Sequence, residues 1–303
     1  MLQANDSALP ATLSDAPLLL PPEIITTNVT SDRDYFVTHR QVVALGRSTL
    51  DLPILMYHYI RTPPSPYKDL VGYNLSISPH DFEMQMDWLA AHGYHPVDFN
   101  DVRAYFAGAR PLPSKPVVIT LDDGYRDLYT TAYPILASHG FKAVAYIVSG
   151  FVGWKQYVTS DQVVEMDHHG IEIACHTVDH ANLARASWPE LMNELVNSKR
   201  YLEKLVGHPV VDFAYPSGQF NQTVIAALRQ TGYDTAVTEL YSTAHSRGDR
   251  YTWTRVRVAG GESLTNFILL LGRVMPSVTD TAVNVETAGL QPSATSPATF
   301  PAS

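Results

Sequence analysis

The chain has 303 residues, of which 45% are hydrophobic and 17% are charged, and its formal net charge at pH 7 is −9. This length and composition suit one large α/β barrel or two ordinary domains, and they exclude wholesale disorder. The negative charge, with no cluster of Lys or Arg, disfavours nucleic acid as a partner. No apolar run approaches the roughly 20 residues that a membrane-spanning helix needs, so we expect no transmembrane segment.

A single cysteine, Cys175, excludes an intrachain disulfide and any multi-cysteine metal site. It ends the apolar run at 171–175, and we therefore expect a packed, unreactive thiol. The N-terminus has no basic segment followed by an apolar one, so the sequence predicts no signal peptide. It therefore indicates either a cytoplasmic protein or a mature or trimmed form.

The two ends of the chain differ in composition from the middle. Residues 1–48 are rich in Ala, Ser, Thr, Pro and Asp, which is typical of an extended leader. Residues 276–303 consist mainly of Ser, Thr, Ala and Pro and are nearly uncharged, which predicts a flexible tail or linker. We expect one catalytic domain between them, at 49–275.

Short apolar segments and amphipathic segments alternate within this domain. The predicted helices begin at capping residues Ser78, Ser160, Ser187 and Asn221, with proline directly after Ser78 and glutamate three residues after Ser187. A further predicted helix runs through residues 133–136 and ends at Gly140. The predicted strands lie at 53–57, 94–97, 116–121, 143–148, 171–175, 210–215, 235–237 and 255–258. Seven or eight strands that alternate with helices predict a parallel sheet in a closed or nearly closed β/α barrel.

Polar residues follow one predicted strand after another. His58 follows the first strand, Asp122 and Asp123 follow the strand at 116–121, His176 begins the segment after 171–175, and residues 215–218 end the next strand. In β/α barrels the carboxyl ends of the strands meet at one rim and carry the functional groups. This regular placement predicts a functional cluster at that rim.

Histidines at this rim have the spacing of metal ligands. His176 and His180 are four residues apart, so on a helical turn they would share a face and could chelate one ion. A lone histidine is more often structural, but a pair beside the Asp-Asp strand end favours ligation. Two imidazoles and one carboxylate form a three-ligand site with open positions, as in catalytic zinc sites. The same donors accept Co²⁺, Ni²⁺, Fe²⁺ or Mn²⁺.

Three segments resemble the main motifs of the polysaccharide deacetylases, the carbohydrate esterases that share a NodB-type domain. They are residues 120–124 (Thr-Leu-Asp-Asp-Gly), 176–180 (His-Thr-Val-Asp-His) and 213–218 (Phe-Ala-Tyr-Pro-Ser-Gly). The resemblance covers roughly residues 50–272. It implies a distorted (β/α)7 barrel and metal-assisted hydrolysis of an N-acetyl, sometimes O-acetyl, group on a sugar polymer.

The resemblance also implies roles for individual residues. Asp123, His176 and His180 would be the metal ligands, and Asp122 the general base. The third motif would supply an oxyanion and substrate loop, formed by Tyr215, Pro216, Ser217 and Gly218, with a backbone N–H near Ser217 as oxyanion donor.

Two departures from the family pattern point to one branch. The arginine that braces the base in the third motif is Ala214 here, and no Leu-x-His motif occurs at 263–267. Both departures are familiar in the poly-N-acetylglucosamine deacetylases of biofilm systems, whose acid histidine comes from a Met-Tyr-His motif near the start. Residues 56–58 match that motif, so the resemblance implies His58 as general acid. The brace would then come from Arg255 or Arg257.

With the donor set above, the resemblance implies a metal-dependent hydrolase, with Zn²⁺ as the expected metal, that removes N-acetyl groups from a GlcNAc-containing polysaccharide and releases acetate. We expect a monomer located outside the cell or in the cell envelope, as the substrate class implies. An O-acetyl esterase of the xylan type and a non-catalytic carbohydrate-binding relative remain alternatives. Poly-N-acetylglucosamine, peptidoglycan, chitin oligomers and acetylated xylan all remain open as the polymer, because specificity resides in loops such as 61–73 and 154–157.

Two other hydrolase classes fit less well. A glycosidase needs two carboxylates that face each other across a sugar bond, whereas neighbours in a strand, such as Asp122 and Asp123, point to opposite sides. A metalloprotease of the His-Glu-x-x-His type needs a glutamate where the chain has Thr177.

Overall fold

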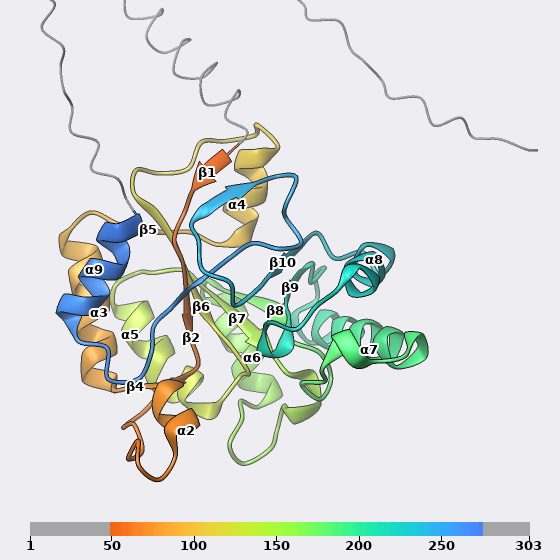
Figure 1. Cartoon of the computed structure of the whole chain (residues 1–303), viewed down its shortest axis with the longest axis horizontal. Helices are drawn as coiled ribbons and strands as arrows, with labels where there is room; N and C mark the ends of the chain where they lie inside the picture. The colour runs from red at the N-terminus through yellow and green to blue at the C-terminus, as the bar shows by residue number, and fades with distance from the viewer. Residues whose placement is uncertain (1–48, 275–303) are drawn as a thin grey trace, which may run out of the picture. The chain divides into compact units, whose positions relative to one another are not determined.

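The computed structural model describes residues 49–274 (Figure 1). The predicted leader at 1–48 and the predicted tail at 276–303 lie outside the described residues.

A parallel eight-stranded sheet forms the centre of the fold, in the order β10-β9-β8-β7-β6-β2-β12, with β5 also paired to β6. Every predicted strand is present, most of them shortened at the ends. Their bounds are β2 (Ile54–Tyr57), β5 (His95–Pro96), β6 (Pro116–Leu121), β7 (Ala143–Ile147), β8 (Ile171–Cys175), β9 (Asp212–Ala214), β10 (Thr235–Val237) and β12 (Val256–Arg257).

One segment, residues 253–258, joins the two ends of this sheet. On one side Trp253 N donates to Ala236 O at 3.1 Å, beside β10. On the other side Val258 N donates to Met56 O at 3.1 Å, and β12 pairs with β2. The sheet is therefore curled into a distorted, incompletely closed barrel, which confirms the predicted fold class.

Helices surround the sheet (Figure 1). The predicted ones are α3 (Pro79–Ala91), α5 (Tyr133–Ser138), α6 (Ser160–His168), α7 (Trp188–Val206) and α8 (Gln222–Gln230). The sequence did not predict α2 (Leu70–Asn74), α4 (Phe99–Phe106), α9 (Leu264–Val274) or the π-helical turn at Leu128–Ala132. It also missed two small pairings, β1 (Thr49–Asp51) with β11 (Ala244–Ser246) and β3 (Tyr59–Ile60) with β4 (Ser76–Ile77).

Alternation along each strand separates two apolar layers. Residues such as Leu55 and Ile119 belong to the large cluster that includes the helices, whereas Ile54 and Val118 belong to a second cluster with Trp253. Side chains two residues apart on a strand share a face, so the second cluster fills the barrel interior. The same alternation places polar side chains in the barrel interior at both ends of the strands.

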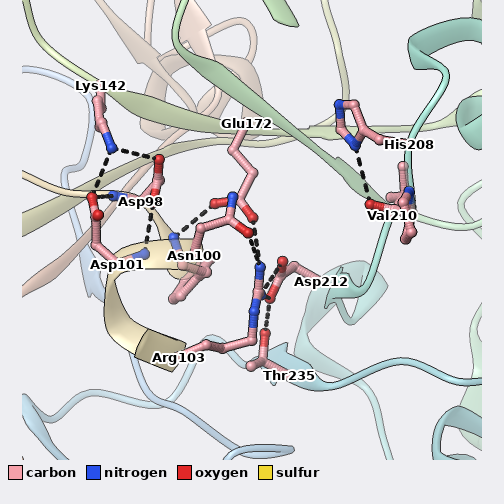
Figure 2. Close-up of polar contacts among 12 residues, drawn as sticks. Asp98, Asn100, Asp101, Arg103, Lys142, Glu172, His208, Val210, Asp212 and Thr235 are labelled. Atoms are coloured by element: carbon pink, nitrogen blue, oxygen red, sulfur yellow. Dashed lines mark hydrogen bonds and ion pairs between the residues drawn. The ribbon is translucent and has the colours of Figure 1, made fainter. Parts of the chain in front are cut away.

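A buried polar network closes the amino end of the barrel. Arg103 of α4 forms an ion pair with Asp212 and lies 3.3 Å from Glu172, and Phe99 N donates to Glu172 Oε2 at 2.7 Å. Figure 2 shows this network, in which Thr235 also donates to Asp212. Burial raises the pKa of Glu172 well above its usual value, and the nearby Asp212 acts in the same direction.

Polar contacts also stabilise the N-terminus of α4, beside this network. The ammonium group of Lys142 contacts Asp98 at 2.9 Å and Asp101 at 2.8 Å, the two residues of the capping box of α4 (Figure 2). The short helix α4 is therefore held by polar contacts as well as by its buried Phe99 and Val102.

Candidate active site

The carboxyl end of the barrel brings together the side chains that the sequence singled out. His58 directly follows β2, Asp122 and Asp123 follow β6, and His176 follows β8. All four are buried, with exposed fractions between 2% and 9%. The strand-end pattern therefore produces one convergent cluster, as in other β/α barrels.

Asp123, His176 and His180 offer three ligand atoms that lie within 4.8 Å of one another. The Nε2 atoms of both histidines are 3.4 Å from Asp123 Oδ1. Ligand atoms about 2.1 Å from a tetrahedral ion lie roughly 3.4 Å apart. Asp123 Oδ1 is buried and has no hydrogen-bond partner in the described part of the chain, which is unfavourable for a carboxylate. This donor set fits a divalent cation.

The tautomer of His176 is fixed by a backbone contact. Its Nδ1 lies 2.8 Å from the carbonyl oxygen of Ala214, which can only accept, so Nδ1 carries the proton. The Nε2 lone pair then faces Asp123. Metal-binding histidines are oriented by such a second contact. Here Ala214, which occupies the position of the motif arginine, provides this contact through its backbone carbonyl.

The spacing of the two histidines suggested a shared helical turn, but the structure has none there. Residues 176–180 form an irregular loop in which Thr177 has φ 68° and His180 has φ 62°. This left-handed backbone turns both rings toward the same carboxylate. The prediction of a helical turn was wrong, because a spacing of four residues fits a tight loop as well as a helix.

Helix α7 holds this loop from behind. Glu194 accepts hydrogen bonds from the backbone N–H of Val178 at 2.8 Å and of Asp179 at 3.2 Å. Ser198, one turn later, donates to the carbonyl of Thr177 at 2.9 Å. The sequence pattern did not single out Glu194 and Ser198, although both are polar residues on the apolar stripe of an amphipathic helix.

Backbone strain is concentrated at the same place. In residues 49–274, five non-glycine residues have positive φ, and four of them belong to the three motifs: Asp123, Thr177, His180 and Ser217. Such conformations cost about 1–3 kcal/mol each and occur preferentially at functional sites. Thr177 is the most unfavourable of the four, because a β-branched residue rarely adopts positive φ.

Asp122 is engaged by an arginine from the far end of the domain. Arg255 donates from Nη1 to Oδ1 at 2.7 Å and from Nη2 to Oδ2 at 2.8 Å. Burial by itself would raise the pKa of Asp122, but the charge and hydrogen bonds of Arg255 hold it below its usual value. Arg257, the other candidate for a brace, instead forms an ion pair with Glu239.

His58 lies beside the same carboxylate. Its Nε2 atom is 3.9 Å from Asp122 Oδ2. Burial lowers the pKa of His58, while the carboxylates of Asp122 and Asp123 oppose this shift. Asp122 therefore has a permanently charged arginine and a titratable histidine as neighbours.

The loop at 215–218 is anchored mainly through Tyr215, whose hydroxyl donates to Tyr251 O at 2.8 Å. The backbone N–H of Tyr215 donates to Val237 O, and that of Gly218 donates to Tyr215 O. Pro216 has no N–H, and the N–H of Ser217 has no acceptor in the described part of the chain. Ser217, with φ 52°, therefore offers the free donor of this loop.

Comparisons with known proteins agree with this geometry. The family model described as polysaccharide deacetylase matches residues 109–236. YxkH of Bacillus subtilis strain 168, whose name assigns it to the polysaccharide deacetylases, is 33% identical over 216 residues, which cover 71% of this chain and 74% of that protein. The chain belongs to the polysaccharide deacetylase family. The predicted family and enzyme class are thereby confirmed.

Other deacetylases of this family are larger than the matched region. The poly-β-1,6-N-acetyl-D-glucosamine N-deacetylase of Escherichia coli K12 is 28% identical over 237 residues, which cover 64% of this chain but only 35% of that protein. The enzyme of the same name from Staphylococcus aureus MRSA252 is also 28% identical, with 52% of this chain and 59% of that protein covered.

Solved deacetylase structures share the fold. The Streptococcus pyogenes deacetylase PplD, in complex with acetate, aligns with a TM-score of 0.68 and 29% identity, over 75% of this chain and 99% of that one. IcaB from Ammonifex degensii aligns with a TM-score of 0.59 and 27% identity, over 69% of this chain and 91% of that one. Within residues 49–274 no helix is long and apolar enough to span a membrane.

Proposed function

We propose that this protein is a metal-dependent deacetylase that removes N-acetyl groups from a GlcNAc-containing polysaccharide and releases acetate. One observation carries the proposal: the buried, unpartnered Asp123 Oδ1 lies 3.4 Å from the Nε2 atoms of both His176 and His180. Two relatives named as poly-β-1,6-N-acetyl-D-glucosamine N-deacetylases support the substrate class.

Asp123, His176 and His180 would hold the ion, and Zn²⁺ suits two imidazoles and a carboxylate, while Co²⁺, Ni²⁺, Fe²⁺ and Mn²⁺ are accepted by the same donors. When bound, the ion polarises the acetyl carbonyl and lowers the pKa of a water molecule to about 7.

Asp122 acts as the general base in this proposal. Arg255 keeps its carboxylate ionised and fixed in position. Each carboxylate oxygen has two lone pairs, so the oxygens that accept from Arg255 can still accept a proton from the attacking water. The water oxygen then forms a bond to the acetyl carbon.

Ser217 and His58 complete the reaction. The free N–H of Ser217 donates to the oxyanion that develops on the acetyl oxygen. Protonated His58 gives its proton to the sugar nitrogen as the C–N bond breaks, which yields acetate and a free amine. The Asp122 carboxylate, 3.9 Å away, favours the protonated imidazole that this step requires.

Acetate release tests the proposal. Metal-free and Zn²⁺-loaded protein are incubated with β-1,6-linked and β-1,4-linked N-acetylglucosamine pentamers, and we expect acetate only from the loaded protein. Asp122→Asn and His58→Ala should each lose most of kcat. Acetate from acetylated xylan alone would favour an O-acetyl esterase, and pentamer binding without acetate would favour a non-catalytic carbohydrate-binding protein.

Residues 49–275 are the catalytic domain in this proposal, and the protein acts as a monomer outside the cell or in the cell envelope. The location follows from the substrate class, because acetylated structural polysaccharides lie there. Fractionation of cells for the full-length protein and size-exclusion chromatography test the two statements.

A further inference from the structure

A pocket of about 330 Å³ lies next to the candidate active site. We call it the basic pocket, and its lining includes Tyr59, Arg61, Tyr125, Arg126, Asp127 and Lys155. Tyr59 directly follows His58, and Tyr125 comes two residues after Asp123. The basic pocket therefore adjoins the catalytic residues along two separate segments.

One wall of the pocket is a rigid aromatic stack. The rings of Tyr59 and Tyr125 are stacked with centroids 3.6 Å apart and an interplanar angle of 17°. Tyr157 stacks on Tyr125 at 5.2 Å, and the guanidinium group of Arg61 lies 3.5 Å from the centre of the Tyr59 ring. Both faces of Tyr59 and of Tyr125 are occupied in this stack, so the wall offers ring edges and hydroxyl groups to a ligand and holds the guanidinium group of Arg61 in place.

The pocket carries uncompensated positive charge. Arg61 donates to the hydroxyl of Ser76, and Arg126 donates to backbone carbonyls, so both have uncharged partners. None of Arg61, Arg126 and Lys155 forms an ion pair within 4.0 Å with an acid of residues 49–274. In a chain of net charge −9, three such cations around one cavity attract an anion.

The acid of the pocket adds an acceptor and, at neutral pH, one negative charge against the three positive ones. Asp127 Oδ1 is buried and has no hydrogen-bond partner among the described residues. Burial raises the pKa of Asp127 to about 6, which Arg61 partly opposes. A sugar hydroxyl would satisfy this oxygen, whereas a cationic amine would be repelled by the three basic side chains.

We infer that the basic pocket binds the sugar residue next to the one deacetylated, and that this residue carries an acidic substituent, a carboxylate or a phosphate. The inference rests on the proposed function. The aromatic wall fixes Arg61 in position, Asp127 accepts from a hydroxyl, and Arg61, Arg126 and Lys155 bind the anion. The substrate class is thus an acidic, N-acetylated glycan.

The experiment uses pentamers of both linkages in three forms: fully N-acetylated, with a succinyl group on the residues flanking the central one, and with a phosphate ester on those residues. We expect kcat/KM of the Zn²⁺-loaded protein to be at least about tenfold higher for one of the acidic forms, because hydrogen bonds to a charged group are stronger than those to a neutral one. Which acidic form is preferred distinguishes carboxylate from phosphate.

Two variants locate the effect. The double variant Arg61→Gln/Lys155→Gln should lose the preference through a higher KM for the acidic pentamer, with little change for the neutral one. Lys204→Gln, an exposed lysine on α7, is the matched control and should keep the preference. Equal kcat/KM for neutral and acidic pentamers in the parent protein, or an unchanged preference in the double variant, would overturn the inference.

Binding separates this inference from the proposed function. Calorimetric titration of the parent and the double variant with the same pentamers measures the pocket whether or not acetate is released. Tighter binding of an acidic pentamer that is lost in the double variant supports the pocket even if turnover fails. Acetate release with equal binding of all three forms supports the enzyme and contradicts the pocket.

Discussion

Arg255 and Asp122 form a buried, bidentate ion pair although 133 positions separate them in the sequence. Arg255 is 1% exposed, and its Nε also donates to Thr238 O at 2.9 Å. The pair therefore joins the segment that closes the barrel to the strand that carries the proposed base. In the family motif an arginine would come from the position of Ala214, so this protein reaches the same carboxylate from the segment just before β12.

Substitutions of Arg255 should distinguish the effect of its positive charge from the effect of its two parallel hydrogen bonds to Asp122. Arg255→Lys keeps a positive charge but cannot form two parallel hydrogen bonds, so we expect kcat to fall about tenfold or more with KM little changed. Arg255→Ala leaves a buried carboxylate unpaired and should lower the free energy of unfolding by about 3–5 kcal/mol. Steady-state acetate release and urea denaturation measure the two effects.

Arg257→Lys is the matched control, because Arg257 lies two residues away but pairs with the partly exposed Glu239. We expect it to retain nearly full kcat and stability. A loss in Arg257→Lys equal to that in Arg255→Lys would contradict a specific brace.

Glu194 should increase the affinity of the site for the metal although it is not a proposed ligand. It accepts from two backbone N–H groups of the loop between the proposed ligands, so Glu194→Ala leaves these donors unpaired and loosens His176 and His180. Loss of such outer contacts typically weakens metal binding 10–100-fold. Competition with a chromophoric chelator measures the Zn²⁺ affinity of the variant.

Glu190→Ala is the control for this prediction. Glu190 belongs to the same helix and closes its capping box with Ser187, but it does not contact the loop. It should lower stability only slightly and leave Zn²⁺ affinity unchanged. Equal affinity in Glu194→Ala and Glu190→Ala would remove Glu194 from this positioning role.

Glu172 should make stability depend on pH. Because burial raises its pKa in the folded state, the stability that protonated Glu172 contributes is complete below its unfolded pKa and is lost as pH rises through the folded pKa. Glu172→Gln stays neutral and avoids this loss. The variant should therefore gain on the parent as pH rises above the unfolded pKa of glutamate, by up to about 1.4 kcal/mol per pH unit. Urea denaturation at pH 5, 6.5 and 8 measures the difference, and a constant difference would contradict the prediction.

The sequence predicted the barrel and its rim because both depend on local patterns. Strand alternation and the placement of polar residues at strand ends are visible in any one segment. Helix α4 was missed because only Phe99 and Val102 are buried in it, although Asp98 and Asp101 form its capping box. Contacts with Lys142 and with the buried acids stabilise it, and these come from distant parts of the chain.

The finer geometry of the site depends on long-range contacts that no local pattern encodes. Arg255 and Arg257 are two residues apart and would share a face of a strand, so alternation could not choose between them. The loop at 176–180 adopts its left-handed conformation because Glu194 and Ser198 hold it there.

Zn²⁺ should raise the melting temperature of this protein. Substitutions of the neighbouring Asp122 and Asp123 should affect this increase differently. Ligand binding to the folded state alone stabilises by about 2.7 kcal/mol at a concentration of 100 times Kd. Asp123→Ala removes a proposed ligand, so the shift on Zn²⁺ addition should disappear. Asp122→Asn is the matched variant, and it should lose acetate release but keep the shift relative to its own metal-free form. Each melting curve is compared with and without Zn²⁺, because Asp122→Asn also leaves Arg255 unpaired. A shift that survives in Asp123→Ala, or vanishes in Asp122→Asn, would reverse the assignment of ligand and base.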